Sequence, residues 1–300
     1  MTLVAAIDCG TNSVKLLIAD LPQVLVRESR VVRLGQGVDE TGRLADDALA
    51  RTFAALEEFG ALIEQYAVPV ERVRFCATSA TRDSDNAGVF VEGVRERLGV
   101  TPQVLSGLEE AALVFDATGF LDPAPAAPAL AVDIGGGSTE LVLGGPERSV
   151  SLDIGSVRLH ERHLSGDPPT AAQWGRCSQD VAEHLDRAAG AGLDLATAGS
   201  VVGTSGTVKT VACGVLDLPF YDRDRIDGAE LPVDATLAFC ERLRAMSVSA
   251  RRALPYMHPG RADVIGAGSL IWSRILERAT VSTYLVSEAD ILYGIARRIA

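Results

Sequence analysis

Apolar and polar residues alternate along the first hundred positions with the periods of strands and helices. Apolar runs at 4–7, 14–19 and 24–33, of which the first two flank a tight polar turn, predict a meander of three strands. Over residues 46–66 apolar side chains recur at helical spacing, with two aspartates in the first turn, where the helix dipole favours them. Strand and helix patterns then alternate up to a helix near residue 108, so we expect an α/β fold.

One motif opens both halves of the chain. Residues 6–18 and 131–143 align without gaps at an offset of 125, with matching apolar positions and identical residues at Ala6/Ala131, Asp8/Asp133, Gly10/Gly135, Ser13/Ser138 and Leu16/Leu141. A proline-rich segment at 122–129 precedes the second copy. In the second half, helices are predicted over 171–189, 233–246, 262–276 and 288–299. The sequence therefore predicts two α/β domains, 1–125 and 126–300, with a last helix able to pack back on the first.

The charge balance limits the classes of ligand. Lysine and arginine total 28 against 40 aspartate and glutamate residues, a net charge of −12, which argues against DNA or RNA binding by counterion release. The only two lysines, Lys15 and Lys209, each follow a valine, so a Walker A loop is excluded. We expect no membrane helix and no secretory leader. The five cysteines form no C-x-x-C pair and are expected to be reduced core residues of a cytoplasmic protein.

The duplicated turn has the chemistry of an anion site. Its glycines allow a tight hairpin and close approach of a ligand, and its N–H groups and hydroxyls are donors for phosphate oxygens, so a net positive charge is not required. Asp8 and Asp133, each at the end of a strand, could hold Mg²⁺ or Mn²⁺. A third loop, 203–207, adds further donors. The predicted phosphate-binding residues are Gly10, Thr11, Asn12, Ser13, Arg82, Gly136, Gly137, Ser138, Thr139, Ser205, Gly206 and Thr207. The alternative is a pair of ordinary glycine-rich hairpins.

Five segments together resemble the exopolyphosphatase and guanosine pentaphosphate phosphohydrolase family and lie in its order: DCGTNS from Asp8, TSATR from Thr78, SGLEEA from Ser106, DIGGGSTE from Asp133 and GTSGT from Gly203. The resemblance implies two ribonuclease-H-like domains of the actin-like ATPase superfamily with a cleft between them, and a homodimer. It also implies that Glu110, the second glutamate of SGLEEA, is the catalytic base.

Three other charged residues have candidate roles. By the same resemblance Glu140 is a second predicted catalytic carboxylate, which could bind a metal or water. Arg82 could clamp phosphates, or pair with Asp83 or Asp85. Glu109, next to Glu110, would point elsewhere, because adjacent helical residues do not share a face.

The expected activity is Mg²⁺-dependent release of orthophosphate from the end of inorganic polyphosphate, with water oriented by Glu110. Three alternatives stay open. The same site would accept guanosine pentaphosphate. The chain could instead be an ATP-dependent small-molecule kinase, or a non-catalytic protein that binds guanosine penta- or tetraphosphate or forms actin-like filaments.

Overall fold

The computed structural model describes residues 3–121 and 124–299. Contacts divide the chain into two compact units, Met1–Ala117 with Ile291–Ala300, and Thr118–Asp290. The division falls at 117/118, eight residues before the predicted boundary, so the chain that follows the helix expected near residue 108 groups with the second unit. Residues 122 and 123 of the predicted proline-rich segment lie outside the described residues.

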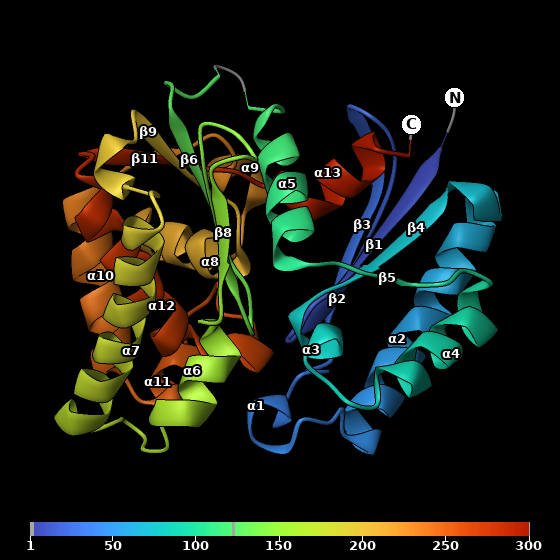
Figure 1. Ribbon diagram of the computed structural model, residues 1–300, viewed down its shortest axis with the longest axis horizontal. Helices are drawn as coiled ribbons and strands as arrows, with labels where there is room; N and C mark the ends of the chain where they lie inside the picture. The colour runs from blue at the N-terminus through green and yellow to red at the C-terminus, as the bar shows by residue number, and fades with distance from the viewer. Residues whose placement is uncertain (1–2, 122–123, 300) are drawn as a thin grey trace. The chain divides into compact units, whose positions relative to one another are not determined.

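The first unit is built on a five-stranded mixed sheet (Figure 1). Its order is β3-β2-β1-β4-β5, with β1 antiparallel to β2 and parallel to β4. The strands are β1 (Val4–Cys9), β2 (Ser13–Asp20), β3 (Gln23–Val31), β4 (Val73–Ala77) and β5 (Gln103–Val104). The predicted meander is confirmed: β1, β2 and β3 are joined by two short turns.

Helices complete the first unit. They are α1 (Val38–Thr41), α2 (Asp46–Gln65), α3 (Ser79–Arg82), α4 (Ala87–Leu98), α5 (Gly107–Thr118) and α13 (Ile291–Arg297). Helices α2 and α4 pack on each other, while α13 returns from the second unit to pack on β1 and β2. The core is apolar and includes Phe59, Phe75 and Phe90, each at most 1% exposed. Burying such rings is the main favourable term in forming this layer.

The second unit repeats the arrangement with six strands in the order β10-β11-β9-β6-β7-β8. The strands are β6 (Ala129–Ile134), β7 (Thr139–Leu143), β8 (Ser149–Leu152), β9 (Ser200–Gly203), β10 (Glu230–Pro232) and β11 (Thr283–Val286). As in the first unit, an antiparallel meander leads into parallel strands, since β6 pairs with β9 in parallel and with β7 in antiparallel orientation. These shared topologies confirm the α/β class and the two ribonuclease-H-like units.

The helices of the second unit are α6 (Ser156–His163), α7 (Ala171–Gly190), α8 (Gly206–Val215), α9 (Arg223–Ile226), α10 (Val233–Ala245), α11 (Val248–Arg252) and α12 (Ile265–Ala279). Helix α12 packs against α6, α7, α8 and α10, and its Trp272 is fully buried. The predicted helix over 288–299 begins three residues late, at Ile291. The N–H groups of Glu288 and Ala289 bind side chains of Asp227 and Ser287 instead.

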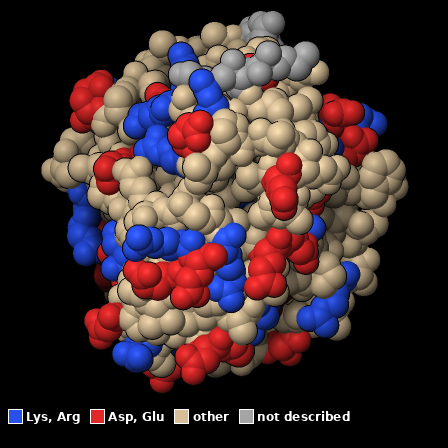
Figure 2. Space-filling view, turned by 90° about the vertical axis from the view of Figure 1, so that its right-hand side faces the viewer, with Lys and Arg blue, Asp and Glu red and all other residues tan. Residues whose placement is uncertain are grey.

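The cysteines and the charged side chains lie where the composition leads us to expect them. The five cysteines are buried and form no disulfide, and burial raises the pKa of Cys76 to about 12. On the face shown in Figure 2, lysine and arginine side chains alternate with aspartate and glutamate. Within residues 3–121 and 124–299, every helix is too short or too polar to span a bilayer.

Candidate functional site

The first glycine turn joins β1 to β2 and is held by main-chain bonds on one side. Gly10 N–H donates to Ser13 O at 3.0 Å. The carbonyls of Thr11 and Asn12 accept bonds of 2.9 to 3.0 Å from N–H groups that follow β3, those of Val32, Arg33 and Gly35. A buried bond of 2.9 Å between Thr11 Oγ1 and Ser79 Oγ ties the turn to α3. The turn therefore has a fixed shape.

Asp8, at the carboxyl end of β1, is buried and lies opposite Lys15 in the β1–β2 register. Lys15 Nζ is 3.1 Å from Asp8 Oδ2. Because opposite residues of an antiparallel pair share one face of the sheet, the ammonium neutralises the carboxylate locally. Asp8 is thus an ion-pair partner here, and its predicted metal-binding role stays a prediction.

Glu110 and Arg82 lie together in the first unit. Glu110 is in the first turn of α5 and only 8% exposed. Arg82 Nη1 donates to Leu105 O at 2.8 Å and lies 3.6 Å from Glu110 Oε2. It also lies 3.7 Å, through Nε, from Asp83 Oδ1. The contact with Asp83 agrees with the ion-pair alternative, and the phosphate clamp predicted for Arg82 stays a prediction.

Glu109 has a different environment from its neighbour. Its Oε2 accepts bonds of 2.8 Å from both the main-chain N–H and the hydroxyl of Ser106. These bonds, the main-chain bond first, lower the pKa of the Glu109 carboxyl. The carboxylate closes the helix start, a capping arrangement. The two adjacent glutamates thus point in different directions, as expected.

The second glycine turn, between β6 and β7, is held by the start of α6. Gly135 O accepts from Ser156 N at 2.9 Å, and Gly136 O accepts from the N–H groups of the next two residues at 2.9 and 3.0 Å. Gly137 O accepts from Arg158 Nε at 2.7 Å. Each carbonyl shares a planar trans peptide with the N–H that follows it, so the two point in opposite directions. The N–H groups of Gly136, Gly137 and Ser138 therefore face away from α6.

Close packing keeps the second turn against α6. A Cβ at Gly155 would lie 2.3 Å from Gly136 O and 2.5 Å from Gly137 N. Only glycine allows this approach of two backbones. Thr139 Oγ1 donates to Ile154 O at 2.6 Å, which fixes the strand that leaves the turn. The predicted donor Thr139 is thus bound within the fold.

Asp133 and Glu140 are cross-strand partners of β6 and β7, at the positions where β1 and β2 carry Asp8 and Lys15. Glu140 is 1% exposed, and its Oε1 accepts a bond of 2.8 Å from Ser151 Oγ. The repeat thus places two carboxylates side by side in the second unit and an ion pair in the first. Carboxylate oxygens are ligands that Mg²⁺ prefers, so both residues have suitable donor atoms, and the metal-binding role predicted for Asp133 stays a prediction.

The third loop follows β9, beside the second turn. Thr204 N donates to Val132 O at 3.0 Å, and Ser205 caps α8 by accepting from Val208 N at 3.2 Å. The loop N–H groups stand at the start of α8, where the helix dipole favours anions. Gly206 lies against half-buried Arg261, since a Cβ there would be 2.5 Å from Arg261 Nη2. Burial lowers the pKa of that guanidinium.

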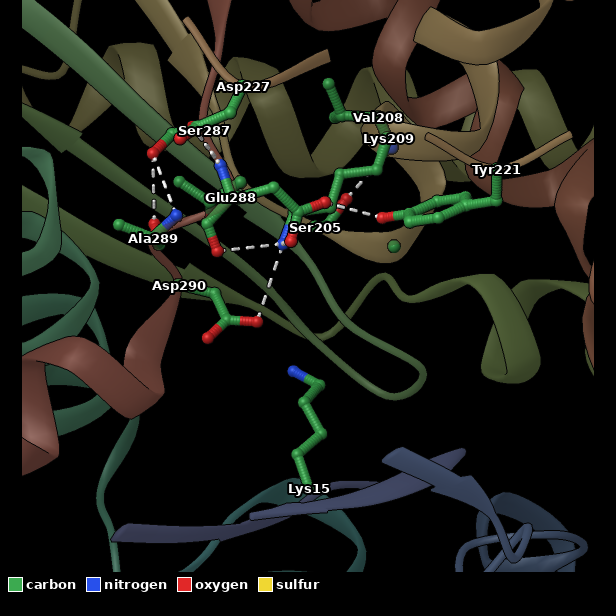
Figure 3. A network of polar contacts seen from close by, with 12 residues as sticks. Lys15, Ser205, Val208, Lys209, Tyr221, Asp227, Ser287, Glu288, Ala289 and Asp290 are labelled. Atoms are coloured by element: carbon green, nitrogen blue, oxygen red, sulfur yellow. Dashed lines mark hydrogen bonds and ion pairs between the residues drawn. The ribbon is translucent and has the colours of Figure 1, made fainter. Parts of the chain in front are cut away.

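A buried polar network lies next to the third loop (Figure 3). Lys209 Nζ donates to Glu288 O at 3.2 Å and lies 3.4 Å from Glu288 Oε2 and 3.6 Å from Asp290 Oδ2. Tyr221 Oη donates to Glu288 Oε1 at 2.6 Å. Burial raises the pKa of Tyr221, and Glu288 raises it further, so the phenol keeps its proton. Lys209 is thus bound by two carboxylates of the chain.

The structure brings the predicted residues into two groups. The first unit holds the turn 10–13, Asp8, Arg82 and Glu110. The second unit holds the turn 136–139, Asp133, Glu140 and the loop 205–207.

Gly155 and Arg158 were not predicted from the sequence. A signal was present: Val32-Arg33-Leu34 and Val157-Arg158-Leu159 are identical at the offset of 125, and both copies supply N–H groups to a glycine turn. Across the described residues, no group of three or more His, Cys, Asp and Glu side chains could hold a metal by itself.

Three comparisons place the chain among known proteins. Exopolyphosphatase 2 of Mycobacterium tuberculosis is 44% identical over 320 residues, which cover 100% of this chain and 99% of that protein. The crystal structure of an exopolyphosphatase-like protein is 40% identical, with a TM-score of 0.92 over 99% of this chain and 100% of that one. An Aquifex aeolicus member of the Ppx/GppA family is 28% identical, with a TM-score of 0.79 over 99% and 97%. The model of the Ppx/GppA phosphatase family matches residues 13–294. The chain therefore belongs to the Ppx/GppA phosphatase family.

Proposed function

We propose that this hydrolase releases orthophosphate from the end of inorganic polyphosphate. The observation that carries the proposal is the full-length match, at 44% identity, to a protein named exopolyphosphatase 2. The chemistry of the turns supports it. A polyphosphate chain presents many oxygens and no other groups, and the second turn offers three N–H groups directed to one side.

In the proposed reaction, Glu110 orients a water molecule against the terminal phosphorus. As the water oxygen forms its bond to phosphorus, the bond to the bridging oxygen breaks; the water proton passes to the carboxylate and the shortened chain leaves. Arg82, 3.6 Å from Glu110 Oε2, would hold the terminal oxygens. The predicted phosphate-binding residues of the turns 10–13 and 136–138 and of the loop 205–207 would bind oxygens of the rest of the chain.

A divalent metal fits the carboxylates of the second unit. Asp133 and Glu140 are hard oxygen donors on one face of the sheet, and they would hold Mg²⁺ or Mn²⁺ together with phosphate oxygens and water. The metal would neutralise charge on the phosphate oxygens. Asp8 would contribute only if Lys15 released it.

The test compares phosphate release from tripolyphosphate, long polyphosphate and guanosine pentaphosphate. We expect the polyphosphates to be the better substrates. Glu110→Gln is expected to lower kcat by about 10² or more while leaving the fold intact. Glu109→Gln is the matched control, because this neighbouring carboxylate is bound by Ser106 and should leave kcat within about twofold. An active Glu110→Gln enzyme, or a preference for guanosine pentaphosphate, would contradict the proposal.

We further propose that the protein acts in the cytoplasm as a homodimer. The five buried cysteines without disulfides support a reducing compartment. Light scattering of the purified protein tests the dimer: twice the 31.6 kDa of the chain is expected, and a mass of one chain would refute it.

A further inference from the structure

Arg158 lies beside the second glycine turn but has no role in the proposed reaction. It belongs to the first turn of α6, is half-buried, and its Nε donates to Gly137 O at 2.7 Å. Its main-chain N–H donates to Gly136 O at 3.0 Å. One residue therefore binds two successive carbonyls of the turn, the second through a charged side chain.

The side-chain bond fixes the direction of one peptide plane. Gly137 O and Ser138 N–H lie in the same planar peptide and point in opposite directions. Glycine at 137 does not by itself restrict this plane, because a residue without a Cβ tolerates several backbone conformations. The carbonyls of Gly135 and Gly136 are bound by main-chain N–H groups of α6, but Gly137 O is bound by a side chain.

We infer that Arg158 is a positioning residue, which aims the Ser138 N–H at the bound phosphate chain by holding the Gly137 carbonyl. The inference rests on the proposed function only for the identity of the ligand. Without the guanidinium, the peptide between Gly137 and Ser138 can rotate. Part of the free energy of ligand binding is then needed to fix the direction of the Ser138 N–H. The affinity for phosphate should fall, while a water held by Glu110 in the other unit is unaffected.

The test is Arg158→Ala, with Arg162→Ala as matched control. Arg162 lies one turn further along the same helix and binds Asp180 at 2.9 Å, so its loss weakens α6 without touching the turn. We expect Arg158→Ala to raise KM for tripolyphosphate about tenfold and to change kcat less than threefold, since charge-assisted hydrogen bonds are among the stronger ones. Added guanidinium ion should restore part of the lost affinity. Arg162→Ala should leave KM unchanged.

Equilibrium binding separates this inference from the proposed activity. Calorimetric titration with tripolyphosphate, without turnover, should show the same tenfold loss for Arg158→Ala. If the wild-type protein binds tripolyphosphate and hydrolyses no polyphosphate, the proposed function fails, whereas weaker binding by Arg158→Ala still supports the positioning role. Equal affinities of wild type and Arg158→Ala, an equal loss in Arg162→Ala, or no recovery with guanidinium would overturn it.

Discussion

Replacing Gly155 by alanine should damage the second turn without removing any polar group. A Cβ there would lie 2.3 Å from Gly136 O, 2.4 Å from its carbonyl carbon and 2.5 Å from Gly137 N. Ordinary contacts begin near 3.4 Å. The obstructing atoms are main chain rather than the end of a flexible side chain, so the turn and the start of α6 must separate by about 1 Å.

The expected cost follows from the contacts that would be stretched. Overpacking a well-packed site costs about 1–3 kcal/mol. The separation also weakens the bonds from Ser156, Val157 and Arg158 N–H to the turn, each worth about 0.5–1.5 kcal/mol when intact. We expect Gly155→Ala to lower the free energy of unfolding by about 2–4 kcal/mol. The KM for tripolyphosphate should rise at least tenfold, because the turn N–H groups lose their direction.

Urea unfolding and initial rates of phosphate release measure the two effects. The matched control is Gly175→Ala in α7, where an added Cβ meets nothing within 4 Å. That change should stabilise the protein by about 0.4–1 kcal/mol, since alanine has less conformational entropy to lose than glycine. Its KM should equal that of the wild type. If Gly155→Ala behaves like Gly175→Ala in both assays, the close approach of the two backbones does not matter and the account of the turn is wrong.

Three further changes test other parts of the structure. Thr11→Val removes the buried bond to Ser79 Oγ and should lower the unfolding free energy by about 1–3 kcal/mol, measured in urea; an unchanged midpoint would count against this link. Tyr221→Phe takes the donor from Glu288 Oε1 and should cost about 1.5–3 kcal/mol by the same assay, whereas a neutral result would mean that water replaces the phenol. The lowered pKa of Glu109 implies stability that is present above about pH 4.5 and lost as the pH falls through its folded-state pKa. Glu109→Gln should flatten this acid part of a stability-against-pH curve, and parallel curves would refute the assignment.

The strands and the repeated turn could be predicted because their signals are local. Apolar runs separated by glycine and small polar residues define β1, β2, β6 and β7, and the offset of 125 residues relates β1 to β6 residue by residue. The start of α13 was predicted too early, because Asp227, distant in sequence, binds the N–H of Glu288.

The support of the second turn could not be read from local patterns. In the sequence Gly155 looks like an ordinary glycine after a strand. A side chain is excluded there only because the backbone of Gly136, about twenty residues away, packs against it. Arg158 shows the same limit, since it binds a carbonyl that the chain brings near by folding. Extending the internal alignment to Val32-Arg33-Leu34 and Val157-Arg158-Leu159 would have identified Arg158 as a candidate.

We expect the main-chain amides of the second glycine turn to bind the phosphate chain. A crystal structure of Glu110→Gln with bound tripolyphosphate would reveal this contact. Phosphate oxygens should lie about 2.7–3.2 Å from the N–H groups of Gly136, Gly137 and Ser138. A phosphate chain bound away from this turn would mean that these amides do not hold the substrate.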